Sequence, residues 1–86
     1  MAQYEIPNGQ GETVIYGFNS TSGYFIQVHD ASGQTVLHRW SLLDGLTGSE
    51  LVEIAEEHGV QLPEAHTLCA MLDLPFEEWN PVVLGQ

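Results

Sequence analysis

Two side chains that can ligate a metal ion, His66 and Cys69, lie three residues apart in the chain. On a helix this spacing places both ligands on one face, as in proteins that bind zinc. A closed zinc site requires four ligands, however, and the sequence contains no second pair at a suitable spacing. Cys69 also belongs to an apolar repeat, where a lone cysteine packs as a small core residue. We therefore predict no metal site, although a small enzyme or metalloprotein built on His66 and Cys69 stays as a competing class.

Other groups capable of catalysis form no motif. Ser41, Ser49 and many carboxylates are present, but the sequence has neither a nucleophile elbow nor a glycine-rich phosphate loop. Residues 8–11 (Asn-Gly-Gln-Gly) are rich in glycine, yet no helix is expected to follow them, so this stretch is interpreted as a loop. His38 falls on the apolar face of an expected strand and is interpreted as a buried imidazole. We predict no catalytic residue, no cofactor and no enzymatic activity.

The carboxylates themselves are the most unusual feature. The chain has 86 residues with twelve carboxylates, one base (Arg39) and no lysine, for a formal net charge of −11. Residues 1–43 carry −2 of this charge and residues 44–86 carry −9. A field of this sign repels phosphates and anionic lipids and speeds encounters with basic proteins. The charge therefore argues against direct binding of nucleic acid or membrane and favours a basic protein partner, with improved solubility alone as the alternative.

The acidic half also carries two aromatic side chains, Phe76 and Trp79, at a spacing of three residues between acidic neighbours. Aromatic anchors with a polar rim are typical of interface hot spots, although both rings could instead cover the core. The candidate partner-binding residues are Glu50, Glu53, Glu56, Glu57, Glu64, Asp73, Phe76, Glu77, Glu78 and Trp79.

Residues 51–72 resemble a helix-turn-helix. Ala55, Gly59, Val60, Ala65 and Leu68 occupy the positions at which such motifs place a small residue, a turn glycine and packing hydrophobes. A recognition helix must present donors to phosphates and base edges. The side expected to be exposed here carries Glu64, His66, Thr67 and Asp73. Because carboxylates repel a polyanion, we interpret this segment as a structural helix pair that does not bind DNA.

The elements that position these residues follow from the spacing of apolar side chains. Residues 14–18, 24–29 and 35–40 alternate with period two and are separated by turns at residues 19–23 and 30–33, where Gly33 is expected in the left-handed position. This pattern predicts a three-stranded antiparallel meander. Its core face would hold Val14, Tyr16, Phe18, Tyr24, Ile26, Val28, Val36, His38 and Trp40.

The opposite face of the predicted sheet would expose Ile15, Phe25 and Leu37. These three side chains are too apolar for a face in full contact with water, and two helices cannot cover both sides of a sheet. We therefore predict that this face is a possible homodimer face or a second partner surface.

Two helices are predicted in the acidic half. Thr47 and Glu50 have the spacing of a capping box, and Gly59 suits the end of the first helix. Pro63 suits the first turn of a second helix, which ends before Pro75. Its apolar stripe would consist of Ala65, Leu68, Cys69 and Leu72. A further helical turn is possible within residues 75–80.

Together these patterns predict a single α+β domain over residues 1–86, in which a three-stranded meander precedes two or three short helices packed on one sheet face. It comprises a sheet half (1–43), an acidic helical half (44–80) and a tail (81–86). One cysteine, and an N-terminus without the features of a signal peptide, favour a cytoplasmic location.

We predict a small acidic protein-binding module or regulator that acts on a basic protein partner. Two alternatives stay open. One is an inhibitor that mimics nucleic acid and blocks a DNA- or RNA-handling system of the restriction or CRISPR type. The other is a structural subunit of a homo-oligomer, for example a homodimer.

Overall fold

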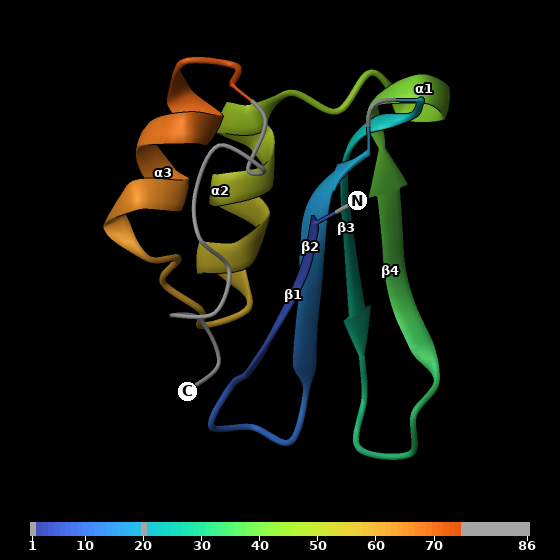
Figure 1. The fold of residues 1–86 in the computed structure, drawn as a ribbon. Helices are drawn as coiled ribbons and strands as arrows, with labels where there is room; N and C mark the ends of the chain where they lie inside the picture. The colour runs from blue at the N-terminus through green and yellow to red at the C-terminus, as the bar shows by residue number, and fades with distance from the viewer. Residues whose placement is uncertain (1, 20, 75–86) are drawn as a thin grey trace.

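The computed structural model describes residues 2–19 and 21–74 and shows an α+β fold, as predicted (Figure 1). A four-stranded antiparallel sheet with the order β1-β2-β3-β4 precedes the helices α2 and α3. The elements are β1 (Ala2–Pro7), β2 (Thr13–Asn19), β3 (Gly23–His29), β4 (Thr35–Trp40), α1 (Ser41–Asp44), α2 (Gly48–Glu57) and α3 (Glu64–Met71). Among the described residues, no helix is both long enough and apolar enough to cross a membrane.

The prediction of three strands is wrong, because β1 adds a fourth strand at the edge of the sheet beside β2. Tyr4 pairs with Tyr16 and Ile6 pairs with Val14, so the apolar residues of β1 share the core face of β2. Tyr4 is buried at 4% exposure. The glycine-rich residues 8–11 belong to the connection between β1 and β2, which confirms that this stretch is a loop.

The two central strands form the core as predicted. The core-facing side chains of β2 and β3 are buried, with the exception of Phe18, which is partly buried against the core. Gly23 and Gly33 have φ values of +80° and +88°, the left-handed conformation that glycine adopts without strain. The Gly33 N–H donates to the Asp30 carbonyl (2.9 Å) and closes the β3–β4 turn.

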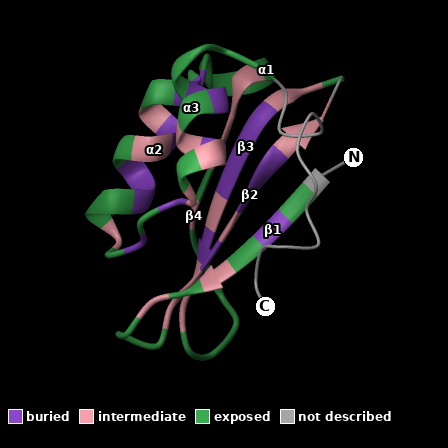
Figure 2. Ribbon diagram, turned by 60° about the vertical axis from the view of Figure 1, so that its left-hand side comes forward, coloured by how far each residue is buried: buried purple, intermediate pink, exposed green. Residues whose placement is uncertain are grey.

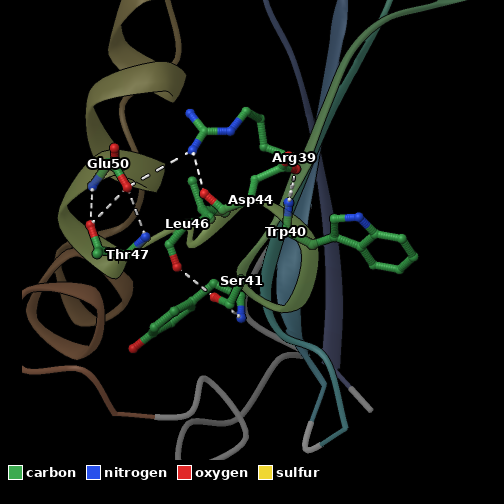
Figure 3. A network of polar contacts seen from close by, with 8 residues as sticks. Arg39, Trp40, Ser41, Asp44, Leu46, Thr47 and Glu50 are labelled. Atoms are coloured by element: carbon green, nitrogen blue, oxygen red, sulfur yellow. Dashed lines mark hydrogen bonds and ion pairs between the residues drawn. The ribbon is translucent and has the colours of Figure 1, made fainter.

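The prediction for the last strand is wrong in phase. Leu37 and Arg39 lie opposite Val28 and Ile26 on the helix-covered face of the sheet. Two residues predicted for the core, His38 and Trp40, instead lie opposite Gln27 and Phe25 on the face away from the helices. The third, Val36, is 52% exposed. Figure 3 shows this reversal, because Arg39 reaches toward α2 while the Trp40 indole points away on the other side of the sheet.

A β-bulge causes the reversal. Val28 pairs with Leu37, whereas the next residue of β3, His29, pairs with Thr35, so that Val36 is an extra residue in β4. One extra residue moves every following side chain to the opposite face. Thr35 therefore remains on the predicted outer face, while Leu37 moves from the predicted outer face to the core side, where it is partly buried.

Helices α2 and α3 lie on one face of the sheet, but α1 does not (Figure 1). The short α1 follows β4 directly and contacts β3 and β4 at the end of the sheet, where the Leu42 N–H donates to the Ser22 carbonyl (3.0 Å). The prediction that all helices pack on one sheet face is therefore corrected for α1. In Figure 2 the buried residues of β2, β3 and α2 face one another, and this layer is the core.

The predicted ends of α2 are confirmed. The Thr47 hydroxyl accepts a hydrogen bond from the Glu50 N–H (3.1 Å), and the Glu50 carboxylate accepts one from the Thr47 N–H (3.1 Å), which together form the capping box. Gly59 follows the helix with φ +77°. The predicted turn at 75–80 and the tail at 81–86 lie outside the described residues.

Candidate functional site

The outer side of α2 carries the first part of the candidate partner-binding set. Leu51, Ile54 and Ala55 face the core, and the capping box fixes where the helix begins. Glu53, Glu56 and Glu57 are exposed on the other side, so the structure brings these predicted carboxylates together on one helix surface.

Glu50 differs from these neighbours, because it is held by contacts within the fold. Besides its role in the capping box, its Oε1 lies 4.0 Å from the Arg39 guanidinium. Arg39 also donates to the Asp44 carbonyl (3.4 Å), and the Asp44 carboxylate accepts from the Trp40 N–H (3.3 Å) (Figure 3). The single arginine of the chain thus joins β4, α1 and α2 and leaves the outer carboxylates of α2 without a cation from Lys or Arg.

Helix α3 is rotated relative to the prediction. Its buried side chains are His66, Cys69 and Ala70, whereas Leu68 and Leu72 of the predicted stripe are 51% and 65% exposed. This corresponds to a rotation of about 100°, or one residue, around the helix axis. Two predicted site residues, Glu64 and Asp73, are exposed as expected.

Close packing against α2 is one reason for this rotation. Gly48, the first residue of α2, lies directly against the backbone of Ala70, and a Cβ at position 48 would collide with the Ala70 carbonyl oxygen. Small residues on both helices therefore meet at the crossing point. Glycine at position 48 therefore lets the backbone of α3 approach α2 closely on the side that carries the buried Ala70.

A buried hydrogen bond is the second reason. The Tyr16 hydroxyl and His66 Nδ1 are 2.8 Å apart, and the Tyr4 ring packs on the imidazole with centroids 4.3 Å apart. The interpretation of His66 as an exposed residue of a recognition helix is therefore wrong. Its burial, at 1% exposure, lowers the pKa of His66 to about 4 and keeps the imidazole neutral at pH 7. Burial also raises the pKa of Tyr16 above its ordinary value.

The buried location of His66 and Cys69 also determines what chemistry they can perform. Cys69 is a free thiol at 1% exposure. Within residues 2–19 and 21–74, no group of three or more His, Cys, Asp or Glu side chains is arranged to hold a metal ion. Enclosed by the helix pair and the sheet, the two side chains contribute to packing.

The end of α3 is tied to the sheet by a second polar contact. The Tyr24 hydroxyl donates to the Leu74 carbonyl (2.8 Å), just beyond the helix. Burial, reinforced by the nearby Asp73 carboxylate and Cys69, raises the pKa of Tyr24 to about 12. The orientation of α3 is therefore fixed at its middle by His66 and at its end by Tyr24.

The outer face of the sheet differs from the predicted dimer face. Ile15 and Phe25 lie on this face as expected, although Phe25 is buried at 8% exposure, whereas Leu37 lies on the opposite side. Trp40 and His38 take its place, with ring centroids 5.0 Å apart. These residues border a shallow depression of about 180 Å³ that is also lined by Gln3, Asn19, Ser22 and Gln27.

Sequence reasoning missed this aromatic depression, because the bulge that places Trp40 and His38 on the outer face leaves no mark in the apolar pattern. The remaining candidate residues Phe76, Glu77, Glu78 and Trp79 lie outside the described residues.

No family model matches this chain, and neither a curated protein nor a solved structure was found to be similar to it.

Proposed function

We propose that this chain is a small acidic protein-binding module that acts on a basic protein partner without catalysis. One observation carries the proposal. Glu53, Glu56 and Glu57 are exposed together on α2. Arg39, which is the one Lys or Arg of the chain, forms its ion pair with Glu50 instead. A surface with one sign of charge and no internal counter-charge attracts a partner of the opposite sign.

The proposed role of the α2 carboxylates is to raise the rate of encounter and to orient the partner. Exposed charges act mainly on the association rate, and their effect weakens as salt screens them within about 10 Å at 0.1 M ionic strength. We therefore expect binding that is strong at low salt and falls steeply as salt is added.

Two charge-reversal variants with equal net charge test this proposal. Glu56→Lys alters the α2 surface, whereas Glu5→Lys alters an exposed position on β1, and each changes the net charge from −11 to −9. The two variants and the unaltered chain are used to capture partners from a lysate of the native host at low and high salt. We expect Glu56→Lys to reduce capture far more than Glu5→Lys, and capture to decrease with salt. Equal effects of both variants, or capture that is indifferent to salt, would contradict the proposal.

A second candidate function is inhibition of a nucleic-acid-handling protein by charge mimicry. It is favoured by the arrangement of Glu53 and Glu57, which repeat after four residues, about 6 Å along the helix axis, and so form a row of fixed negative charges. A purified DNA nuclease bound to a fluorescent duplex serves as the test. A mimic displaces the duplex at low salt, and a chain that binds the nuclease without displacing DNA supports the module and excludes the mimic.

A further inference from the structure

The exposed side of α3 carries an apolar surface that remains uncovered within residues 2–19 and 21–74. Leu68, Met71, Leu72 and Leu74 are 51%, 57%, 65% and 42% exposed, and we refer to these four residues as the α3 stripe. They account for four of the seven large hydrophobic residues that are exposed in the described part of the chain. A concentration of this kind on one helix surface is typical of an interaction site, whereas single exposed hydrophobic residues are ordinary.

The α3 stripe cannot turn inward, because two contacts on the opposite side of the helix and one just beyond its end hold α3 in place. His66 is hydrogen-bonded to Tyr16, Ala70 packs on Gly48, and Tyr24 binds the Leu74 carbonyl. A rotation that buried Leu68 would break the first two contacts. The apolar surface is therefore presented in a fixed orientation, which reduces the entropy that α3 itself would lose when a partner binds.

Negative charge surrounds the α3 stripe. Glu64 lies one turn before Leu68 on the same side of the helix, and Asp73 lies within the stripe. On the α2 side, the Ser49 hydroxyl approaches the Met71 sulfur at 3.7 Å, and Glu53 is four residues after Ser49 on the same side of α2. Met71 of the α3 stripe and Glu53 of α2 therefore lie on adjoining parts of the helical layer.

We propose that the α3 stripe binds a cationic amphipathic helix of the basic partner. Apolar side chains of that helix would pack on Leu68, Met71 and Leu72, while its Lys or Arg residues would lie near Glu53, Glu64 and Asp73. Charge complementarity selects this occupant, because a second copy of a chain with a net charge of −11 would bring like charges together. The inference rests on the proposed function and identifies the surface that supplies affinity to it.

A synthetic peptide provides the probe. It is a fluorescein-labelled helix of leucine and lysine in which leucine recurs at i, i+3, i+4 and i+7, and its control has the same composition in an order without an apolar face. Fluorescence anisotropy with the full chain measures both affinities. We expect the amphipathic peptide to bind at least tenfold more tightly than the scrambled one, which corresponds to about 1.4 kcal/mol.

Two double variants locate the binding surface. Leu68→Gln/Leu72→Gln alters the α3 stripe, and Leu42→Gln/Leu43→Gln alters two leucines of α1 that are 64% and 69% exposed. We expect the first variant to weaken peptide binding roughly tenfold or more and the second to leave it unchanged. Equal affinities for the two variants, or for the two peptides, would overturn the inference.

The same variants separate this inference from the proposed function and from other occupants. Both proposals stand if Leu68→Gln/Leu72→Gln no longer binds the peptide and captures as little of the lysate partner as Glu56→Lys does. If it keeps full, salt-sensitive capture, the proposed function stands and this inference falls. If the unaltered chain is a homodimer that this variant dissociates, the surface binds a second copy and the inference is overturned. If this variant lowers the Tm far more than the α1 variant does, the surface packs against another part of the chain, and the inference is again overturned.

Discussion

Lowering the pH should destabilise this protein through one buried imidazole, that of His66. The folded state holds the pKa of His66 at about 4, whereas the ordinary value of 6.5 applies in the unfolded chain. Below pH 6.5 the unfolded chain therefore takes up a proton that the folded protein refuses. The stability contributed by the neutral imidazole is complete above pH 6.5 and is lost as the pH falls toward 4.

The size of the effect follows from the two pKa values. A difference of one in pKa corresponds to about 1.4 kcal/mol, so the interval from 6.5 to about 4 corresponds to a loss of about 3 kcal/mol. This is a large fraction of the 5–15 kcal/mol by which small domains are typically stable. Protonation would also place a proton on both ring nitrogens of His66, so that Nδ1 could only donate toward the Tyr16 hydroxyl, 2.8 Å away.

His66→Asn is the matched control for this measurement. The asparagine amide does not titrate, and its oxygen can accept the Tyr16 hydrogen bond near the position of Nδ1. Both proteins keep all twelve carboxylates and the other three histidines, so titrations at those sites cancel in the difference between them. The variant is expected to be less stable near pH 7, because asparagine fills less space than the imidazole.

The assay is urea denaturation, followed by tryptophan fluorescence, from about pH 7.5 to about pH 4. The difference in the free energy of unfolding between the two proteins should shrink by about 3 kcal/mol as the pH falls. A difference that stays constant across this range would refute the reasoning, because it would mean that His66 takes up protons equally in the folded and unfolded states.

Substitutions at three further positions test how the helices are held, each by urea denaturation. Gly48→Ala should cost about 2–3 kcal/mol, because the new Cβ collides with the Ala70 carbonyl, and a loss below that of an ordinary surface change would contradict this close contact. Thr47→Ala should cost about 1 kcal/mol while Thr47→Ser costs little, and equal losses would show that the hydroxyl does not cap α2. Tyr24→Phe should cost about 1 kcal/mol, since the hydrogen bond to the Leu74 carbonyl is lost. An unchanged free energy of unfolding would show that this hydrogen bond does not stabilise the fold.

Local sequence patterns predicted the parts of the fold that depend on neighbouring residues. The alternation in β2 and β3 identified their buried side chains, and the capping box at Thr47 identified the start of α2. Both signals arise from interactions within a few positions of the chain, which a sequence displays directly. The strand β1 was missed although Tyr4 and Ile6 alternate with polar residues, because a short run ending in Pro7 is a weak signal without its pairing partner.

The candidate surfaces were harder to predict, because they depend on contacts between distant residues. The bulge opposite Val28 and His29 reversed β4 and placed Trp40 on the outer face of the sheet, and nothing in the alternation of β4 reveals it. In α3, the leucine repeat indicated the wrong buried side. The true side is selected by Tyr16 and Gly48, which lie far from α3 in the chain.

The bulge in β4 has a consequence for the edge of the sheet. As the last strand of the order β1-β2-β3-β4, β4 leaves one side of its backbone available to a strand from another molecule. An extra residue at Val36 interrupts the regular spacing of N–H and C=O groups that such a strand would have to match. The same irregularity that turns the Trp40 ring to the outer face of the sheet therefore protects β4 against edge-to-edge aggregation.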